Sequence, residues 1–281
     1  MQDEVLLTGR SGKLHGKLWT ADHQPIRGVV IAIHGLGDHS QRFAAVATEL
    51  CEAQWALFAF DLQGHGRSPG TRGKIDNYDA LLADIAAARS TVQEKLGSVH
   101  QVLLGHSMGG NLALNYTLRS TEFETDLARL AGLVLVSPMI LPPNPPQRPH
   151  VFAAWLTGHV FPWLRFGKSV ANDKLSNDPS QASSIQDDSL THTQISIHLA
   201  TQLLAQGRWA IDHAREIEVP SLIMHGDEDE LIDQSACEHL AVRIGTPASY
   251  VLWPKMRHAL LQDIGSERVI DRLITWLNNI R

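Results

Sequence analysis

The residues with the clearest chemical meaning are Gly105 to Gly109 (GHSMG), which match the pattern G-x-S-x-G. They lie between an apolar run at Val99–Leu104, which predicts a strand, and a helical pattern at Asn111–Leu118. A nucleophile raised above the edge of a sheet needs a tight turn, and glycine lets the neighbouring backbone pass closely enough. A plain glycine-rich turn can carry the same letters, but the strand–turn–helix setting favours Ser107 as a nucleophile.

A serine hydroxyl reacts only when a base takes its proton and an acid orients that base. The candidate base is His258, which follows the last predicted strand on a short loop. A doubly wound sheet binds its ligands at the carboxyl ends of its strands, and the histidine comes last in triads that use this motif. His213, His225 and His239 also follow the serine. His239 falls within a predicted helix, and His225 ends a predicted strand, where local packing explains it.

The candidate acid lies in the loop His225–Asp233 (HGDEDELID), which follows a strand predicted at Pro220–Met224. Any carboxylate on this loop could reach the histidine. Spacing alone does not separate Asp227, Asp229 and Asp233, because solvated charges near a helix N-terminus explain some of them equally well.

An acyl-transfer site also needs N–H donors for the oxyanion that forms on the carbonyl. One is expected from the backbone N–H of Met108, the residue after the serine. The second is expected from the loop His34–Gly37 (HGLG), after the predicted strand Gly28–Ile33. Within this loop, the second donor is assigned to the backbone N–H of Leu36. Taken alone, that loop also fits a glycine-rich turn without chemistry.

The elements that must position these residues alternate between strand and helix along most of the chain. The segment Val5–Trp19 alternates polar and apolar residues around two glycines, as a hairpin does. Short apolar runs predict further strands at Gly28–Ile33, Trp55–Phe60, Val99–Leu104, Leu130–Val136, Pro220–Met224 and Ala248–Leu252. Apolar residues at helical spacing predict helices at Phe43–Ala53, Asp79–Leu96, Asn111–Leu118, Ser235–Val242 and Glu267–Ile280. We therefore predict an α/β fold with a mostly parallel, doubly wound sheet covered by helices on both faces.

The alternation stops between Ile140 and Arg208, where a proline cluster marks a rigid exit from the sheet and a helix-rich segment without a clear strand follows. We predict that residues 140–208 form a helical cap inserted into a core of residues 1–139 and 209–281. Within the cap we predict Trp155, Phe161 and Trp163 as substrate-binding residues, because such an aromatic run lines an acyl-binding tunnel or docks onto a lipid surface. Packing of the cap onto the core would explain the same residues.

Composition restricts the remaining choices. The 281 residues are 43% hydrophobic and 19% charged, which is typical of a globular protein. A formal net charge of −6, without a block of Lys and Arg, argues against a nucleic-acid partner. Neither a basic and apolar leader nor a run of about 20 apolar residues is visible, so we expect a cytoplasmic protein. Cys51 and Cys237 are expected to be reduced thiols, and no spacing suggests a metal or another cofactor.

Three motifs stand in order along the chain: His34–Phe43 (HGLGDHSQRF), Asp61–Gly70 (DLQGHGRSPG) and Gly105–Gly110 (GHSMGG). They resemble the motifs H-G-x-G-E-H-S-x-R-Y, D-x-x-G-H-G-x-S-x-G and G-H-S-M-G-G of the monoacylglycerol lipase and lysophospholipase-like α/β-hydrolases. The loop Gly226–Asp233 is similar to the acid loop of that family, and His258 matches its base. These motifs span most of the predicted core, whereas the predicted cap is matched only loosely.

The resemblance implies an α/β-hydrolase fold and selects Asp229 as the acid of a triad with Ser107 and His258. It favours a serine esterase or lipase that acts through an acyl-enzyme on monoacylglycerol or lysophospholipid-type esters. The aromatic run of the cap predicts a transient contact with a membrane surface. Two positions depart from the family. Asp38 replaces the usual Glu, and Ile232 stands where mammalian monoacylglycerol lipases have Cys, so their sensitivity to thiol reagents is not expected here.

Other chemistries on the same fold stay open. A short-chain carboxylesterase, thioesterase, perhydrolase, peptidase or carbon–carbon bond hydrolase would use the same three residues. Dehalogenases and epoxide hydrolases are disfavoured, because they place Asp at the turn where this chain has Ser107. A non-catalytic protein that binds a small ligand or a partner is also disfavoured, since such proteins commonly lose a triad residue and none is lost here.

Overall fold

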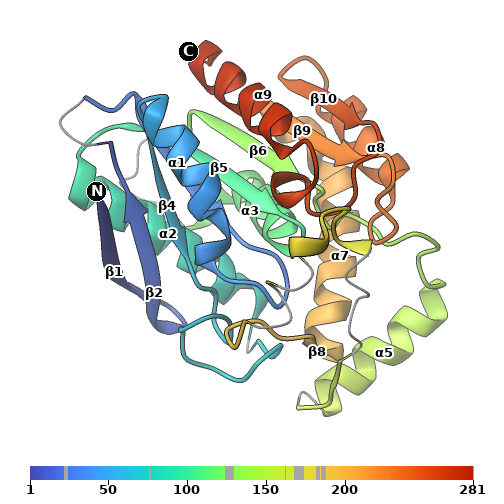
Figure 1. Ribbon diagram of the computed structural model, residues 1–281. Helices are drawn as coiled ribbons and strands as arrows, with labels where there is room; N and C mark the ends of the chain where they lie inside the picture. Colours follow the sequence, from blue (N-terminus) through green and yellow to red (C-terminus); the bar gives the residue numbers. More distant parts are fainter. Residues whose placement is uncertain are drawn as a thin grey trace.

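The computed structural model describes residues 1–21, 25–75, 77–123, 130–161, 163–167, 174–181, 184 and 188–280. Within these ranges eight strands form the central sheet: β1 (Gln2–Gly9), β2 (Gly12–Trp19), β3 (Gly28–Ile33), β4 (Trp55–Phe60), β5 (His100–His106), β6 (Gly132–Val136), β9 (Ser221–Gly226) and β10 (Ala248–Trp253). Their order is β1-β2-β4-β3-β5-β6-β9-β10 (Figure 1). β2 pairs antiparallel with β1 and β4, and all other pairs are parallel. The predicted α/β fold with a mostly parallel sheet is confirmed.

Both faces of the parallel strands are apolar, because helices cover each of them. In β3, Val29, Ile31 and Ile33 contribute to one core layer, and Val30 and Ala32 to the other. The helices over the first layer are α2 (Tyr78–Leu96), α3 (Met108–Leu118), α7 (Ile197–His213) and α8 (Gln234–Ile244). The second layer is covered by α1 (Ala44–Glu52) and α9 (Ser266–Asn279), which lie side by side in Figure 1. The sheet is therefore wound on both sides, as predicted.

The predicted elements of the core agree with the structure to within a few residues. β3 and β4 begin and end with their apolar runs, and the hairpin predicted at Val5–Trp19 is formed by β1 and β2. α3 begins at Met108, three residues earlier than predicted. The reason is that Gly109 and Gly110, which have low helix propensity, hide the start of this helix in the sequence pattern.

The stretch predicted as a cap, residues 140–208, is called the insertion below. Its described elements are α5 (Arg148–Val160), β7 (Arg165–Gly167), β8 (Gln194–Ser196) and the first part of α7. β7 pairs antiparallel with β8, so the prediction of no clear strand here is wrong; three residues are too few to show an alternation. α7 packs against both α5 and α3 and continues past the predicted end of the cap at Arg208.

Short helical segments complete the described chain: η1 (Ser40–Phe43), α4 (Ser120–Phe123), η3 (Ala214–Glu216) and η4 (Leu260–Gln262). η1 follows the loop predicted to supply an oxyanion donor, and η4 begins two residues after the candidate base. None of the helices in the described ranges is long and apolar enough to cross a membrane.

Candidate active site

Ser107 occupies the turn between β5 and α3, at the carboxyl edge of the sheet. Its backbone has φ 54° and ψ −118°. Such a conformation costs on the order of 1–3 kcal/mol for a residue other than glycine and persists only where the surroundings enforce it. A Cβ at Gly109 would overlap the carbonyl oxygen of Ile33, and one at Gly105 would overlap that of Gly109. The Ser107 N–H donates to the Val136 carbonyl at 3.0 Å. These contacts hold the serine in a strained position on its turn.

Asp229 and His258, on the loops after β9 and β10, are bonded to each other. His258 Nδ1 lies 2.8 Å from Asp229 Oδ2, and both side chains are buried. Asp229 Oδ1 accepts from the backbone N–H groups of Leu231 at 2.8 Å and Ile232 at 3.2 Å. Burial alone would raise the pKa of Asp229, but His258, His225 and the Leu231 N–H stabilise the carboxylate and hold its pKa below the ordinary value. An ionised Asp229 keeps a proton on His258 Nδ1, which leaves Nε2 available as a base.

The other two carboxylates of the acid loop have different partners. Asp227 Oδ1 accepts from the backbone N–H of Lys255 at 2.6 Å. Asp233 caps α8, because its side chain accepts from the Ser235 N–H at 3.0 Å. Turn and cap bonds of this kind are ordinary roles for aspartate outside an active site. Among the three candidates, the geometry favours Asp229 as the acid.

The alternative histidines have other surroundings. His225, at the end of β9, is fully buried, and its Nε2 lies 3.5 Å from Asp229 Oδ2. The packing role predicted for His225 is therefore incomplete, because it also contacts the acid. His213 stacks on Trp209 with ring centroids 4.0 Å apart, and its Nδ1–H donates to the Trp209 carbonyl. His239 is exposed on α8. His258 is the histidine that bonds to Asp229 at short distance.

His106, the residue before the nucleophile, contacts the candidate base. The two ring centroids are 5.1 Å apart, and His106 Nε2 lies 3.3 Å from the His258 carbonyl oxygen. Burial, followed by the neighbouring His258, lowers the pKa of His106 to about 3, so its ring stays neutral at neutral pH. His106 is not predictable as part of the site from the sequence, since the motif accepts any residue at that position.

The backbone N–H groups of Leu36 and Met108, predicted as oxyanion donors, have no acceptor among the described residues. Met108 is the first residue of α3, where a helix leaves its N–H groups without an internal partner. The loop that carries Leu36 passes close to the serine, since a Cβ at Gly35 would lie 3.2 Å from Ser107 Cβ. The role of both N–H groups as oxyanion donors stays a prediction.

The aromatic residues predicted to bind substrate lie on the surface of the insertion. Trp155 is 42% exposed, Phe161 46% and Trp163 64%. Phe161 and Trp163 meet edge to face with centroids 5.6 Å apart, and Trp155 stacks with Phe152 at 5.9 Å. In Figure 1, α5 lies apart from the sheet, beyond α7. Packing of the insertion onto the core does not explain rings this exposed, and their binding of an acyl chain stays a prediction.

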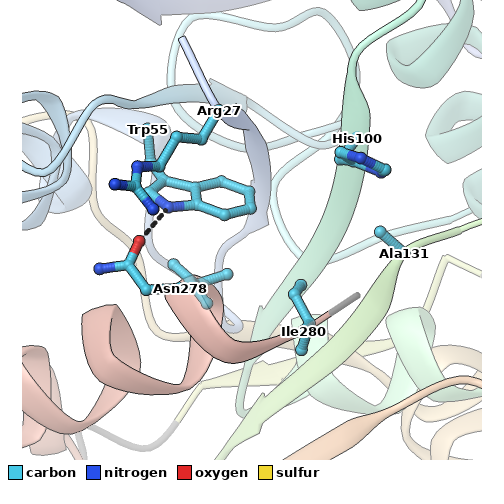
Figure 2. A pocket seen from close by; sticks show the side chains of 7 residues that line it. Arg27, Trp55, His100, Ala131, Asn278 and Ile280 are labelled. Atoms are coloured by element: carbon cyan, nitrogen blue, oxygen red, sulfur yellow. Dashed lines mark hydrogen bonds between the residues drawn. The ribbon is translucent and has the colours of Figure 1, made fainter.

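A cavity of about 180 Å³ lies at the opposite edge of the sheet from Ser107 (Figure 2). Its lining residues are Arg27, Trp55, His100, Ala131, Leu277, Asn278 and Ile280. Figure 2 shows the Trp55 indole N–H bonded to Asn278 Oδ1, at 3.0 Å. Because it lies at the amino ends of the strands, this cavity is not the candidate substrate site. In the part of the chain that the structure describes, no three His, Cys, Asp or Glu side chains gather as metal ligands.

Known proteins share the sequence pattern and the fold of this chain. The family model described as serine aminopeptidase S33 matches residues 24–265. An abhydrolase domain-containing protein of Dictyostelium discoideum is 29% identical over 97% of this chain, which spans only 28% of that protein's length. A monoacylglycerol lipase of Mycolicibacterium smegmatis is 25% identical over 92% of this chain and 91% of its own length. The crystal structure of a Paleococcus ferrophilus monoacylglycerol lipase is 25% identical, with a TM-score of 0.83 over 95% of this chain and 99% of that one.

Proposed function

We infer the chemistry of this chain from its family: it belongs to the serine aminopeptidase S33 family and is a serine hydrolase with the α/β-hydrolase fold. We propose that it hydrolyses carboxylic esters with Ser107 as the nucleophile, His258 as the base and Asp229 as the acid. The observation that carries this proposal is the 2.8 Å hydrogen bond between Asp229 and His258, on loops at the same sheet edge as the strained turn of Ser107.

The proposed reaction proceeds in two steps through an acyl-enzyme. His258 Nε2 takes the Ser107 proton as Oγ attacks the ester carbonyl carbon, while the N–H groups of Leu36 and Met108 stabilise the oxyanion. His258 then protonates the leaving alcohol, and the acyl group stays on the serine. In the second step His258 takes a proton from water as the water oxygen attacks the carbonyl carbon of the acyl-enzyme. The bond to Ser107 Oγ then breaks, His258 returns the proton to that oxygen, and the carboxylic acid leaves. Asp229 stays ionised and stabilises the imidazolium in both steps.

We propose as substrate an ester with an apolar acyl chain, either a monoacylglycerol or a lysophospholipid-type ester. Proteins named monoacylglycerol lipase are similar to this chain along most of their length. The exposed aromatic residues of the insertion supply apolar surface for such a chain. A short-chain carboxylesterase, thioesterase, perhydrolase or peptidase would use the same triad, and the family description itself names an aminopeptidase. The lipases among the relatives favour an ester over a peptide.

The exposed rings support a further part of the proposal: residues 140–208 act as a cap that brings the site to a lipid surface. Phe152, Trp155, Phe161 and Trp163 present aromatic area outward. Trp and Phe side chains are favourable at a membrane interface, where their rings bury apolar area and the indole N–H of Trp stays near water. We propose that this contact is transient, that the same residues receive the acyl chain, and that the protein works from the cytoplasm.

The length of the preferred acyl chain tests the substrate. We expect kcat/KM on p-nitrophenyl esters to rise from two carbons to eight or more, because each buried CH₂ contributes about 0.8 kcal/mol. Monoacylglycerols of the same lengths provide a parallel series, and a Ser107→Ala protein serves as the blank. An optimum at two to four carbons would contradict the proposed lipase activity and indicate a general short-chain esterase. If the protein cleaves an aminoacyl p-nitroanilide faster than the esters, the proposed ester substrate is wrong and a peptidase is indicated.

A further inference from the structure

A buried carboxylate closes the loop that carries the candidate base. Asp263 lies five residues after His258, and it is 3% exposed. We propose that Asp263 is a positioning residue, which fixes the loop of His258 and ties to it the segment Lys174–Asp178 of the insertion. The inference rests on the function proposed above and adds to it a residue that acts through the base.

Asp263 first holds the backbone on the amino side of His258. Its Oδ2 accepts the backbone N–H of Arg257, the residue before the base, at 2.7 Å. Its Oδ1 accepts the N–H of Ile264 at 2.9 Å. The stretch Arg257–Asp263 is thereby closed on itself, which restricts the backbone from which the His258 side chain projects.

The same carboxylate also accepts hydrogen bonds from the insertion. The Asn177 backbone N–H reaches Asp263 Oδ1 at 2.6 Å, and the Ser176 hydroxyl reaches it at 3.1 Å. The Asn177 side-chain amide lies 3.3 Å from Asp263 Oδ2 and 3.1 Å from the Lys255 carbonyl oxygen. Ser176 also lies within 3.1 Å of the carbonyl oxygen of Gln262. One side chain therefore joins two segments that are far apart in the sequence.

The backbone N–H groups of the residues before and after His258 both donate to acceptors elsewhere in the chain. The Arg257 N–H donates to Asp263, and the Ala259 N–H donates to the carbonyl of Leu175 in the insertion at 2.8 Å. A shift of the insertion would therefore move the backbone of His258, on which its 2.8 Å bond to the acid depends. Because small misplacements of a catalytic group slow the chemical step strongly, we expect the loss of Asp263 to affect kcat more than substrate binding.

Capping of α9 is the simpler explanation for an acidic residue just before that helix, and the geometry argues against it. The N-cap of α9 is Gly265, and no side chain caps the helix. Asp263 contributes only its backbone carbonyl there, which accepts from the Ser266 N–H at 3.0 Å. The carboxylate faces the base loop and the insertion instead. Bonds to a charged acceptor are roughly twice as strong as neutral ones, so the charge of Asp263 matters to both links.

Asp263→Asn tests the proposal, with Asp271→Asn on the exposed face of α9 as the matched control. We expect Asp263→Asn to lower kcat on a p-nitrophenyl ester about tenfold, with KM changed less than about twofold. The NMR resonance of the His258 Nδ1 proton should broaden or vanish in Asp263→Asn and persist in Asp271→Asn. An unchanged kcat and an unchanged resonance, in a protein that merely unfolds at lower urea concentration, would reduce Asp263 to a structural role and overturn the proposal.

Ser176→Ala tests the link to the insertion separately. This change removes one donor to Asp263 and leaves the bond to Arg257, so we expect kcat to fall by about threefold. In the Asp263→Asn background the same change should cause no further loss, because both act through one carboxylate. If the two changes lower kcat independently, so that their fold-losses multiply in the double variant, the link is contradicted. If Asp263→Asn fails to fold, Ser176→Ala decides alone, and an unchanged kcat with an unchanged resonance would overturn the proposal.

The NMR comparison also separates this inference from the proposed function, since the His258 resonance requires no substrate. A wild-type protein that hydrolyses no ester would reject the proposed function. The spectra of wild type, Asp263→Asn and Asp271→Asn would still decide whether Asp263 positions His258.

Discussion

The sheet edge that carries the proposed triad and the insertion beside it differ in how tightly the fold holds their side chains. At the sheet edge, close backbone contacts enforce the turn of Ser107, and Asp229 and His258 are buried and bonded to each other. In the insertion, the rings of Trp155 and Trp163 are exposed on the surface. A rigid, buried scaffold therefore holds the proposed catalytic residues, whereas the surface that we propose meets the substrate is under few packing constraints.

The largest effect of a single carboxylate is expected at the sheet edge. Asp229→Asn should lower kcat by about four orders of magnitude, because an amide would hold His258 in the wrong tautomer. Asp227→Asn and Asp233→Asn change a turn bond and a helix cap, so we expect each to leave kcat within about tenfold of the wild type. Steady-state kinetics of the three variants on one p-nitrophenyl ester measure the contrast. Equal losses in all three would contradict the choice of Asp229.

A smaller effect of a different kind is expected in the insertion. Replacement of Trp155, Phe161 and Trp163 together by Ser should weaken binding to phospholipid vesicles by about thirtyfold, because partial burial of three rings contributes about 2 kcal/mol. On a two-carbon ester kcat should fall by less than about threefold, since this acyl group is too short to reach the rings. Vesicle sedimentation and ester kinetics measure the two effects. Unchanged vesicle binding with a large loss of kcat would reverse the roles that we assign to the two regions.

The smallest effect concerns the buried histidine beside the base. Burial and His258 lower the pKa of His106 to about 3, from an ordinary value of 6.5. Below pH 6.5 the unfolded chain binds a proton that the folded protein does not, so stability falls as the pH falls. Between pH 7.5 and pH 5.5, His106 alone should lower the free energy of unfolding by about 1.4 kcal/mol. Urea unfolding at both pH values measures this effect. In His106→Gln the free energy of unfolding should fall between the two pH values by about 1.4 kcal/mol less than in the wild type. Equal losses in the variant and the wild type would exclude His106 as the source.

Much of the core can be predicted from the sequence, because its strands are buried on both faces. Gly28–Ile33 and Trp55–Phe60 are uninterrupted apolar runs, and β3 and β4 begin and end at the same residues. The turn at Ser107 is predictable for a related reason: the backbone passes so closely that Gly105 and Gly109 cannot carry a side chain. Patterns of this kind are local, and the sequence displays them directly.

Contacts between distant segments could not be predicted in this way. Spacing alone leaves Asp227, Asp229 and Asp233 equivalent. The family resemblance selects Asp229, and its short contact with His258 supports that choice. Asp263 carries no local signal, because its partners in the insertion lie 86 and 87 residues earlier in the chain. The strands β7 and β8 pair residues that are 27 to 31 positions apart, and each strand is too short to show an alternation in the sequence. The sequence shows the aromatic run in the insertion, but it does not show that these rings are exposed.

Covalent labelling with a fluorophosphonate shows whether Ser107 is the nucleophile. Such a probe reacts with a serine whose hydroxyl is activated by a neighbouring base. We expect the wild type to gain one adduct, which mass spectrometry of its peptides assigns to Ser107. Ser107→Ala should gain none, and its kcat should fall by about six orders of magnitude. An unlabelled wild type, or an adduct that persists in Ser107→Ala, would contradict the assignment.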